Sequence, residues 1–134
     1  MPLIARLPLQ IRFSDVDSLG HVNNAFYLSY FELARMEFFK LSGLKINWHK
    51  IGIIIARVEI DYLRPLLLYN SAEVICKAGI TGNKSFELLY ELTAQNKEDN
   101  AEIVCKGKST QVCFDYELNK SVLIPEDWKQ VLLS

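Results

Sequence analysis

The stretch SDVDSLGHVNNAFYLSYFELAR, residues 14–35, joins a polar loop to the start of a long apolar segment. Two aspartates lie one residue apart, a Gly-His pair follows, and two asparagines precede a run of aromatic and aliphatic residues. Asparagine is a favoured N-cap, because its side chain accepts a hydrogen bond from a free N–H of the first helical turn. The stretch therefore predicts a helix that is capped by Asn23 or Asn24.

This helix is predicted to span residues 24–42. Its apolar residues recur at intervals of three and four, which places them on one face; they are Tyr27, Phe31, Ala34, Phe38 and Leu41. Four further apolar residues widen this face: Leu28, Leu33, Met36 and Phe39. We therefore expect a helix that is mostly buried. Gly43 can end it, since glycine readily adopts the left-handed conformation common after the last turn.

Alternation of apolar and polar residues predicts strands on both sides of the helix. The predicted strands are residues 9–13, 54–62, 74–80, 86–94 and 102–115. Gly82-Asn83 marks a hairpin between the third and fourth strands, and Pro125 begins a short terminal helix. A run of strands after one long helix predicts a single α+β domain over residues 1–134. An antiparallel sheet of about five strands would curl around the helix.

The composition excludes several classes of partner. Fifteen Lys and Arg against sixteen Asp and Glu give a net charge of -1, so no basic surface for nucleic acid is expected. No apolar run approaches the roughly 20 residues needed to span a bilayer. The first residues are interrupted by Pro2 and do not resemble a signal peptide. We therefore expect a cytoplasmic protein that binds neither nucleic acid nor membrane.

Cysteine and histidine usage limits the metal and redox chemistry. The three cysteines, Cys76, Cys105 and Cys113, lie in apolar strand-like segments, which indicates buried free thiols. His21 and His49 are the only histidines, and there is no Cys-x-x-Cys pair, so no zinc site is expected. The sequence also lacks a P-loop and a dinucleotide fingerprint. We expect neither a metal nor a cofactor.

Residue types alone leave two interpretations of the polar loop. Asp, Ser and Asn before a helix are common caps and turn formers, and this is the simpler interpretation. Alternatively, the unpaired N–H groups of the helix start could polarise a carbonyl oxygen, while Asp15 or Asp17 attacks that carbonyl or deprotonates water. Such a site would suit a thioester, because a thiolate leaves more readily than an amine.

The motif D-x-D-x-x-G-H-V-N-N-x-x-Y, followed by F-E-x-A-R, closely resembles the signature of hotdog-fold acyl-CoA thioesterases, specifically the 4-hydroxybenzoyl-CoA thioesterase-like family. Its positions here are Asp15, Asp17, Gly20, His21, Val22, Asn23, Asn24 and Tyr27, then Phe31, Glu32, Ala34 and Arg35. Residues 56–74, in which a strand is closed by a Tyr-x-x-Pro motif at residues 62–65, and residues 108–128 also resemble the family, so the resemblance covers essentially the whole chain. One departure is Tyr69-Asn70-Ser71, where many relatives have Gly-Asp.

The resemblance implies a hotdog fold and the hydrolysis of an acyl-CoA or acyl-carrier-protein thioester to free acid and thiol. It places the catalytic carboxylate, acting as nucleophile or general base, at Asp17. Backbone amides at the start of the long helix would polarise the carbonyl. The implied substrate-binding residues are His21, Asn23, Asn24, Ala25 and Tyr27, with Arg57 and Val58 supplied by a facing subunit.

The resemblance also implies a homo-oligomer, a dimer formed by joining two sheets or a tetramer of such dimers. Arg57, Arg64 and Lys84 are candidates for contacting CoA phosphates. Two alternatives remain open. Other hotdog branches use a glutamate of the long helix as the base, here Glu32 or Glu37, and a non-catalytic module could bind acyl groups without hydrolysis. The sequence leaves the acyl chain undefined, whether short, long or aromatic.

Overall fold

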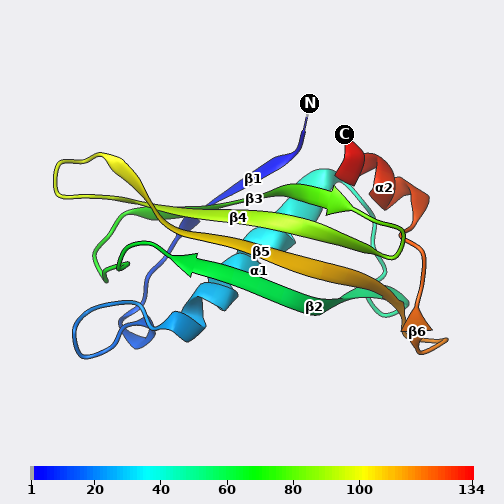
Figure 1. The fold of residues 1–134 in the computed structure, drawn as a ribbon, viewed down its shortest axis with the longest axis horizontal. Helices are drawn as coiled ribbons and strands as arrows, with labels where there is room; N and C mark the ends of the chain where they lie inside the picture. Colours follow the sequence, from blue (N-terminus) through cyan, green and yellow to red (C-terminus); the bar gives the residue numbers. More distant parts are fainter. Residues whose placement is uncertain (1) are drawn as a thin grey trace.

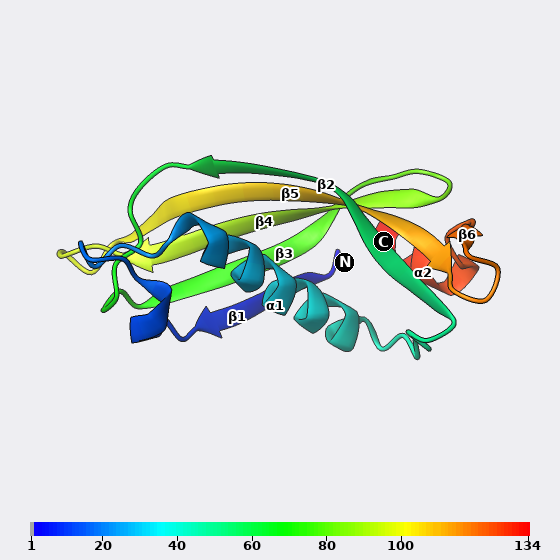
Figure 2. The ribbon, with the colours of Figure 1, turned by 90° about the horizontal axis from the view of Figure 1, so that it is seen from below.

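The long helix α1 (Asn24–Ser42) lies across one face of an antiparallel sheet in the computed structural model, which describes residues 2–134 (Figure 1 and Figure 2). The strands are β1 (Ile4–Leu9), β2 (Ile51–Tyr62), β3 (Ala72–Thr81), β4 (Ser85–Gln95), β5 (Ala101–Asp115) and β6 (Lys120–Ser121). They lie in the order β1-β3-β4-β5-β2, with β6 paired to the end of β5. A second helix, α2 (Glu126–Leu133), follows β6. The predicted α+β architecture is confirmed, with the short β6 added to the five predicted strands.

Both predicted ends of α1 are confirmed, because each end has the chemistry that a helix terminus needs. The side chain of Asn23 is the N-cap and accepts a hydrogen bond from the Ala25 N–H at 3.2 Å. Gly43 follows the last turn with φ of 75°, a left-handed conformation that glycine adopts without steric cost. The Asn23 cap therefore fixes where the loop before α1 ends.

Only one face of α1 is buried. The buried side chains are Tyr27, Tyr30, Phe31, Ala34, Phe38 and Phe39. The expectation of a mostly buried helix is wrong for the other face, where apolar side chains are about half exposed: Leu28, Leu33, Met36 and Leu41. A helix that packs on a single sheet can bury only the stripe facing that sheet. The stripe is shifted from the predicted one, because it includes Phe39 and Tyr30 and leaves Leu41 exposed.

The inner face of the sheet is built by strict alternation along β4. Phe86, Leu88, Tyr90, Leu92 and Ala94 are buried on the face that carries α1, and the residues between them lie on the partly exposed outer face. The predicted hairpin at Gly82-Asn83 is confirmed by the hydrogen bond from the Gly82 N–H to the Ser85 carbonyl at 2.8 Å. The strands predicted at 54–62, 74–80, 86–94 and 102–115 are all present, each extended by up to three residues.

The first predicted strand, residues 9–13, is wrong in position. β1 spans Ile4–Leu9, and residues 13–15 instead form a single 3-10 turn in which Phe13 is 83% exposed. Leu9 pairs with Ala72, the first residue of β3, so no partner strand is available beyond it. Pro8 is tolerated inside β1 because this strand is at the edge of the sheet, where a missing N–H costs little.

The three cysteines are free and buried, as predicted. Burial raises the pKa of Cys76 and of Cys105 to about 12 and that of Cys113 to about 11, so the thiols stay protonated at neutral pH. Neither helix within residues 2–134 combines the length and apolar character needed to cross a membrane.

Gly107 of β5 is the point of closest approach between sheet and helix, which gives a first prediction. A Cβ added there would lie 2.6 Å from Cζ of Phe31, a side chain of α1 that is itself buried. We expect Gly107→Ala to lower the free energy of unfolding by about 1–3 kcal/mol through overpacking. The urea midpoint of purified protein measures this. Gly79→Ala is the matched control, because the nearest atom to its added Cβ lies at 3.1 Å. An effect of Gly107→Ala no larger than that of the control would contradict the close approach.

Candidate active site

Asp17 organises a tight turn in the loop that leads into α1. The Asp17 N–H donates to the His21 carbonyl at 2.8 Å, and the Gly20 N–H donates to the Asp17 carbonyl at 3.0 Å. Oδ1 of Asp17 accepts hydrogen bonds from the N–H groups of Leu19 and His21, at 2.9 and 3.2 Å. Gly20 has φ of 78°, which allows the chain to reverse at this point. The second oxygen, Oδ2, has no hydrogen-bond partner among residues 2–134, and the side chain is exposed.

The segment after β2 is hydrogen-bonded to this turn through the main chain. The Val22 N–H donates to the carbonyl of Leu66 at 2.7 Å, and the Leu68 N–H donates to the Gly20 carbonyl at 3.2 Å. Leu66 is fully buried, so the segment is anchored in the core. The turn around Asp17 is therefore held against the Tyr-x-x-Pro segment as well as against α1.

Asp15 is the buried anchor of the loop. Its side chain is 1% exposed, and its oxygens accept hydrogen bonds from the backbone N–H and guanidinium of Arg12 and from the Tyr30 hydroxyl, the last at 2.9 Å. Its carbonyl accepts a hydrogen bond from the Asn23 N–H at 2.8 Å. Asp15 thus ties the loop both to the buried face of α1 and to the N-cap residue.

The charge of Asp15 is stabilised despite its burial. Burial by itself would raise the pKa of this carboxyl, but the hydrogen bonds from Arg12 and Tyr30 and the charge of Arg12 outweigh it, so the pKa is lowered from its ordinary value. The pKa of Tyr30 is raised by burial and then by the hydrogen bond to Asp15, so the phenol remains a donor. The first aspartate of the motif is therefore an ionised structural group.

The hydrogen bonds at the start of α1 leave one amide free. The Asn23 N–H is bonded to Asp15, the Ala25 N–H to the Asn23 side chain, and the Phe26 N–H to the Asn23 carbonyl at 3.0 Å. The Asn24 N–H, in contrast, has no acceptor among residues 2–134. An unpaired N–H at the positive end of a helix is suited to bind an anion or a polarised carbonyl oxygen.

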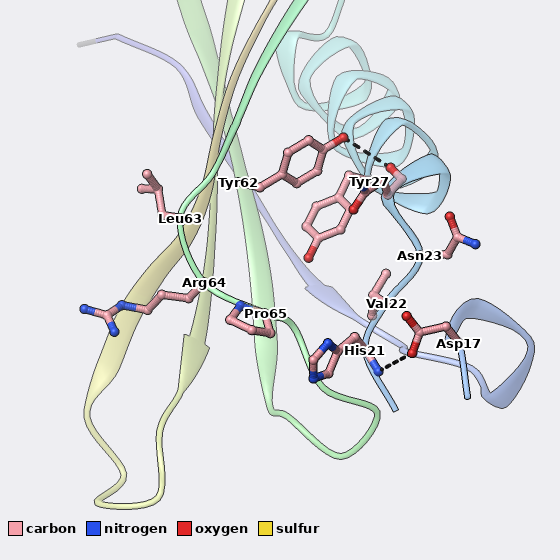
Figure 3. Close-up of a pocket in the computed structure, with 10 residues that line it drawn as sticks. Asp17, His21, Val22, Asn23, Tyr27, Tyr62, Leu63, Arg64 and Pro65 are labelled. Carbon is pink, nitrogen blue, oxygen red and sulfur yellow. Dashed lines mark hydrogen bonds between the residues drawn. The ribbon is translucent and has the colours of Figure 1, made fainter. Parts of the chain in front are cut away.

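A cavity of about 450 Å³ brings these groups together (Figure 3). Its lining residues are Asp17, His21, Val22, Asn23, Asn24, Tyr27, Tyr62, Leu63, Arg64 and Pro65. Asp17 and Asn23 lie on the side of the loop and the helix start, and Tyr27 and Tyr62 lie between α1 and the end of β2. The cavity therefore has a polar side that carries a carboxylate and a free amide, and an aromatic side.

Five of the predicted site residues line this cavity: Asp17, His21, Asn23, Asn24 and Tyr27. The structure does not place the other three there. Ala25 lies outside the lining and its N–H already donates to Asn23. Arg57 and Val58 lie on β2, the last strand on its side of the sheet within residues 2–134, and they do not line the cavity of their own chain.

Tyr62, Leu63 and Pro65 line the cavity without having been predicted as site residues. Their signal in the sequence is the Tyr-x-x-Pro motif, which ends a strand and gives no indication of what it faces. Arg64, a predicted phosphate contact, lines this cavity and also a neighbouring one of about 340 Å³. Lys84, another such candidate, lies in the β3–β4 hairpin at the opposite end of the sheet.

No group of three or more His, Cys, Asp or Glu within residues 2–134 is arranged to hold a metal ion.

The model of the thioesterase-like superfamily matches residues 11–132, which include every element from the Asp17 loop to α2. The chain belongs to this superfamily. The Escherichia coli (strain K12) protein named long-chain acyl-CoA thioesterase FadM is 26% identical over 127 residues, covering 92% of this chain and 93% of FadM.

Solved structures agree with this membership. A thioesterase from Thermus thermophilus, crystallised in complex with coenzyme A and Zn, is 33% identical with a TM-score of 0.83, covering 97% of this chain and 98% of that one. The 4-hydroxybenzoyl CoA thioesterase from Pseudomonas sp. strain CBS-3 is 17% identical with a TM-score of 0.85, over 96% and 98% of the two chains, and supports the fold alone. The predicted hotdog fold and the predicted thioesterase class are confirmed.

The buried carboxylate of Asp15 gives the second prediction. Asp15→Asn should lower the free energy of unfolding at pH 7 by about 1–3 kcal/mol, because Arg12 and Tyr30 lose a charged acceptor. Since the folded-state pKa is lowered, the contribution is complete above the unfolded-state value of about 3.9 and is lost as pH falls through the folded-state value. Urea unfolding from pH 7 downward should show the difference from wild type shrinking below about pH 4. Tyr30→Phe, which keeps the Arg12 contacts, should cost only about 1 kcal/mol. A pH-independent difference would contradict an ionised Asp15.

Proposed function

We propose that this thioesterase hydrolyses an acyl-CoA thioester to the free acid and the thiol, with Asp17 as the catalytic carboxylate. The observation that carries the proposal is that the unbonded Oδ2 of Asp17 and the unbonded N–H of Asn24 belong to residues lining the same cavity. The names of the relatives support the substrate class, since one is an acyl-CoA thioesterase and another was crystallised with coenzyme A.

The Asn24 N–H would bind the thioester carbonyl oxygen. When the carbonyl carbon is attacked, negative charge develops on this oxygen, and a fixed donor at a helix start stabilises it without reorganising. Donors of this kind are worth roughly 10²–10³-fold in rate. Asn24 is the appropriate donor because the neighbouring amides are already bonded within the loop and the first turn.

Asp17 can act either as a nucleophile or as a general base. As a nucleophile, its oxygen bonds to the carbonyl carbon, the C–S bond breaks and the thiolate leaves with the electron pair; water then hydrolyses the resulting mixed anhydride. As a general base, it takes a proton from water as the water oxygen attacks the carbonyl carbon; the tetrahedral intermediate then collapses, the C–S bond breaks, and the thiolate leaves with the electron pair and takes up the proton from Asp17. The hydrogen bonds from Leu19 and His21 hold Oδ1 and orient the other oxygen in either case.

The CoA portion would leave the cavity on the side of Arg64. This side chain is 60% exposed and its ion pair with Glu102 is long, at 3.5 Å, so it can turn to meet a phosphate. Arg57 is likewise exposed and lies on the free edge of β2. An acyl-carrier protein presents the same thioester arm, and comparison of the two carriers as substrates distinguishes them.

A homodimer would form through the free edge of β2. This strand pairs only with β5 within the described part of the chain, and its apolar residues Ile54, Ile55 and Val58 are about 40% exposed. An unpaired apolar edge is a template for joining to another strand. Pairing two copies would bring Arg57 and Val58 of each chain towards the site of the other, and dimers could assemble further into tetramers.

Asp17→Asn is the direct test of the proposed role. The substitution keeps the size of the side chain but removes its charge, and we expect kcat/KM for acyl-CoA to fall by roughly 10²–10⁴-fold. Release of free CoA is followed with a thiol-reactive dye. Glu117→Gln, the same chemical change at an exposed position after β5, should retain wild-type activity.

Three results would contradict parts of this proposal. A wild-type protein that binds acyl-CoA without releasing thiol would be the non-catalytic module instead. Full activity in Asp17→Asn would be compatible with thioesterase activity but would contradict a catalytic role for Asp17. Glu32→Gln and Glu37→Gln would then be tested. A rate that rises as pH falls below about 5 would be incompatible with an ionised carboxylate as base or nucleophile.

The oligomer gives a separate prediction. Light scattering on the purified protein should give a mass that is two or four times the 15.4 kDa of the chain. Val58→Lys should lower this mass at a given concentration, since a charge on the β2 edge opposes strand pairing. Ile80→Lys places the same charge on β3, at an apolar residue that is already 75% exposed, and should leave the mass unchanged. A monomeric wild type would rule out the shared site.

A further inference from the structure

We infer that the ring of Tyr62 is the end wall of the acyl subsite and restricts this thioesterase to short aliphatic or single-ring aromatic acyl groups. The inference rests on the proposed function, because it takes the Asn24 N–H as the donor to the carbonyl oxygen. It concerns specificity, and Tyr62 takes no part in the chemical step.

The two sides of the cavity fix the direction of the acyl group. With the carbonyl at the Asn24 N–H and beside Asp17, the polar side is occupied by the reacting atoms. The phosphates and amides of CoA suit the mouth near Arg64, and the acyl group, which is apolar, must lie along the remaining side. The apolar and aromatic lining consists of Val22, Tyr27, Tyr62, Leu63 and Pro65 (Figure 3). Of these, the Tyr62 side chain is hydrogen-bonded to the main chain of Asn24 itself.

The Tyr62 ring is held in place from two directions. It meets the ring of Tyr27 edge to face, with centroids 5.0 Å apart and an interplanar angle of 85°. Its hydroxyl donates to the Asn24 carbonyl at 3.4 Å, so it also touches the first turn of α1. Tyr27 is only 3% exposed and cannot move aside. The two rings therefore form an aromatic bridge from the end of β2 to the start of α1.

The same bridge separates the cavity from a further apolar surface. α1 packs mainly on β1 and β3, and on its side towards β2 it is contacted by Tyr62 through Tyr27 and Asn24. Beyond Tyr62, β2 continues with the apolar residues Ile60 and Val58. A chain that passed Tyr62 would find apolar neighbours, but the ring blocks its path. In this cavity of about 450 Å³, the ring therefore limits how far the acyl group can extend from the carbonyl.

The test compares kcat/KM across butanoyl-, octanoyl-, hexadecanoyl- and benzoyl-CoA. Wild type should prefer the butanoyl and benzoyl substrates. Tyr62→Ala should raise the ratio for octanoyl over butanoyl, by about fourfold for each methylene that gains burial and so tenfold or more overall. Tyr62→Phe keeps the ring and should keep the wild-type ratio. Tyr116→Ala is the matched control, since Tyr116 is also a half-exposed tyrosine in edge-to-face contact, with Phe114 at 5.4 Å, but lies away from the cavity.

The outcomes separate this inference from the proposed function. If the wild type releases no thiol from any of these substrates, the proposed function itself is contradicted. Hydrolysis by wild type with hexadecanoyl-CoA as good a substrate as butanoyl-CoA would overturn the inference alone, and so would an unchanged ratio in a folded Tyr62→Ala. If Tyr62→Ala lacks a cooperative unfolding transition, Tyr62→Leu replaces it, and the same change in ratio is required.

Discussion

The packing of one face of α1 on the inner face of the sheet determines where the rest of the molecule lies. At its centre Phe31 stacks on Tyr90 with ring centroids 4.5 Å apart, and the adjacent β5 position is Gly107, which has no side chain to hold the helix away. Burial of these rings and their neighbours supplies the main driving force for holding helix and sheet together. Because this contact fixes the axis of α1, it also fixes the position of the helix N-terminus relative to the end of β2.

The candidate site then follows from how the helix start is satisfied. The Asp15 carbonyl and the side chain and carbonyl of Asn23 bind the neighbouring amides except that of Asn24, so the loop defines which N–H is left for a ligand. The groups proposed for the chemistry are a main-chain amide and a carboxylate held by main-chain amides. Such a site depends on backbone geometry more than on the identity of most side chains.

The parts of this structure that local patterns encode were predictable, and the parts that depend on distant partners were not. Asn23 and Gly43 gave both ends of α1, and alternation gave four strands. Residues 9–13 have the strand period too, but the partner strand begins opposite Leu9, and nothing near residue 9 encodes that limit. Asp15 and Asp17 look alike in the sequence, and only Tyr30 and Arg12 make one of them a buried anchor. The placement of Tyr62 against α1 likewise depends on a contact between residues far apart in the chain.

The order of the strands also has a consequence for folding. Short hairpins join β3 to β4, β4 to β5 and β5 to the two-residue β6. In contrast, β1 pairs with β3 across the whole of α1 and β2, and β2 pairs with β5 across β3 and β4. Long-range pairings carry a larger loop-closure cost and slow the search, so the three-stranded meander is expected to form first. The Asp17 loop has anchors on α1 and on the segment after β2, so it is expected to take its final shape after these two have packed on the meander. The region proposed for catalysis is thus among the last parts of the chain to become ordered.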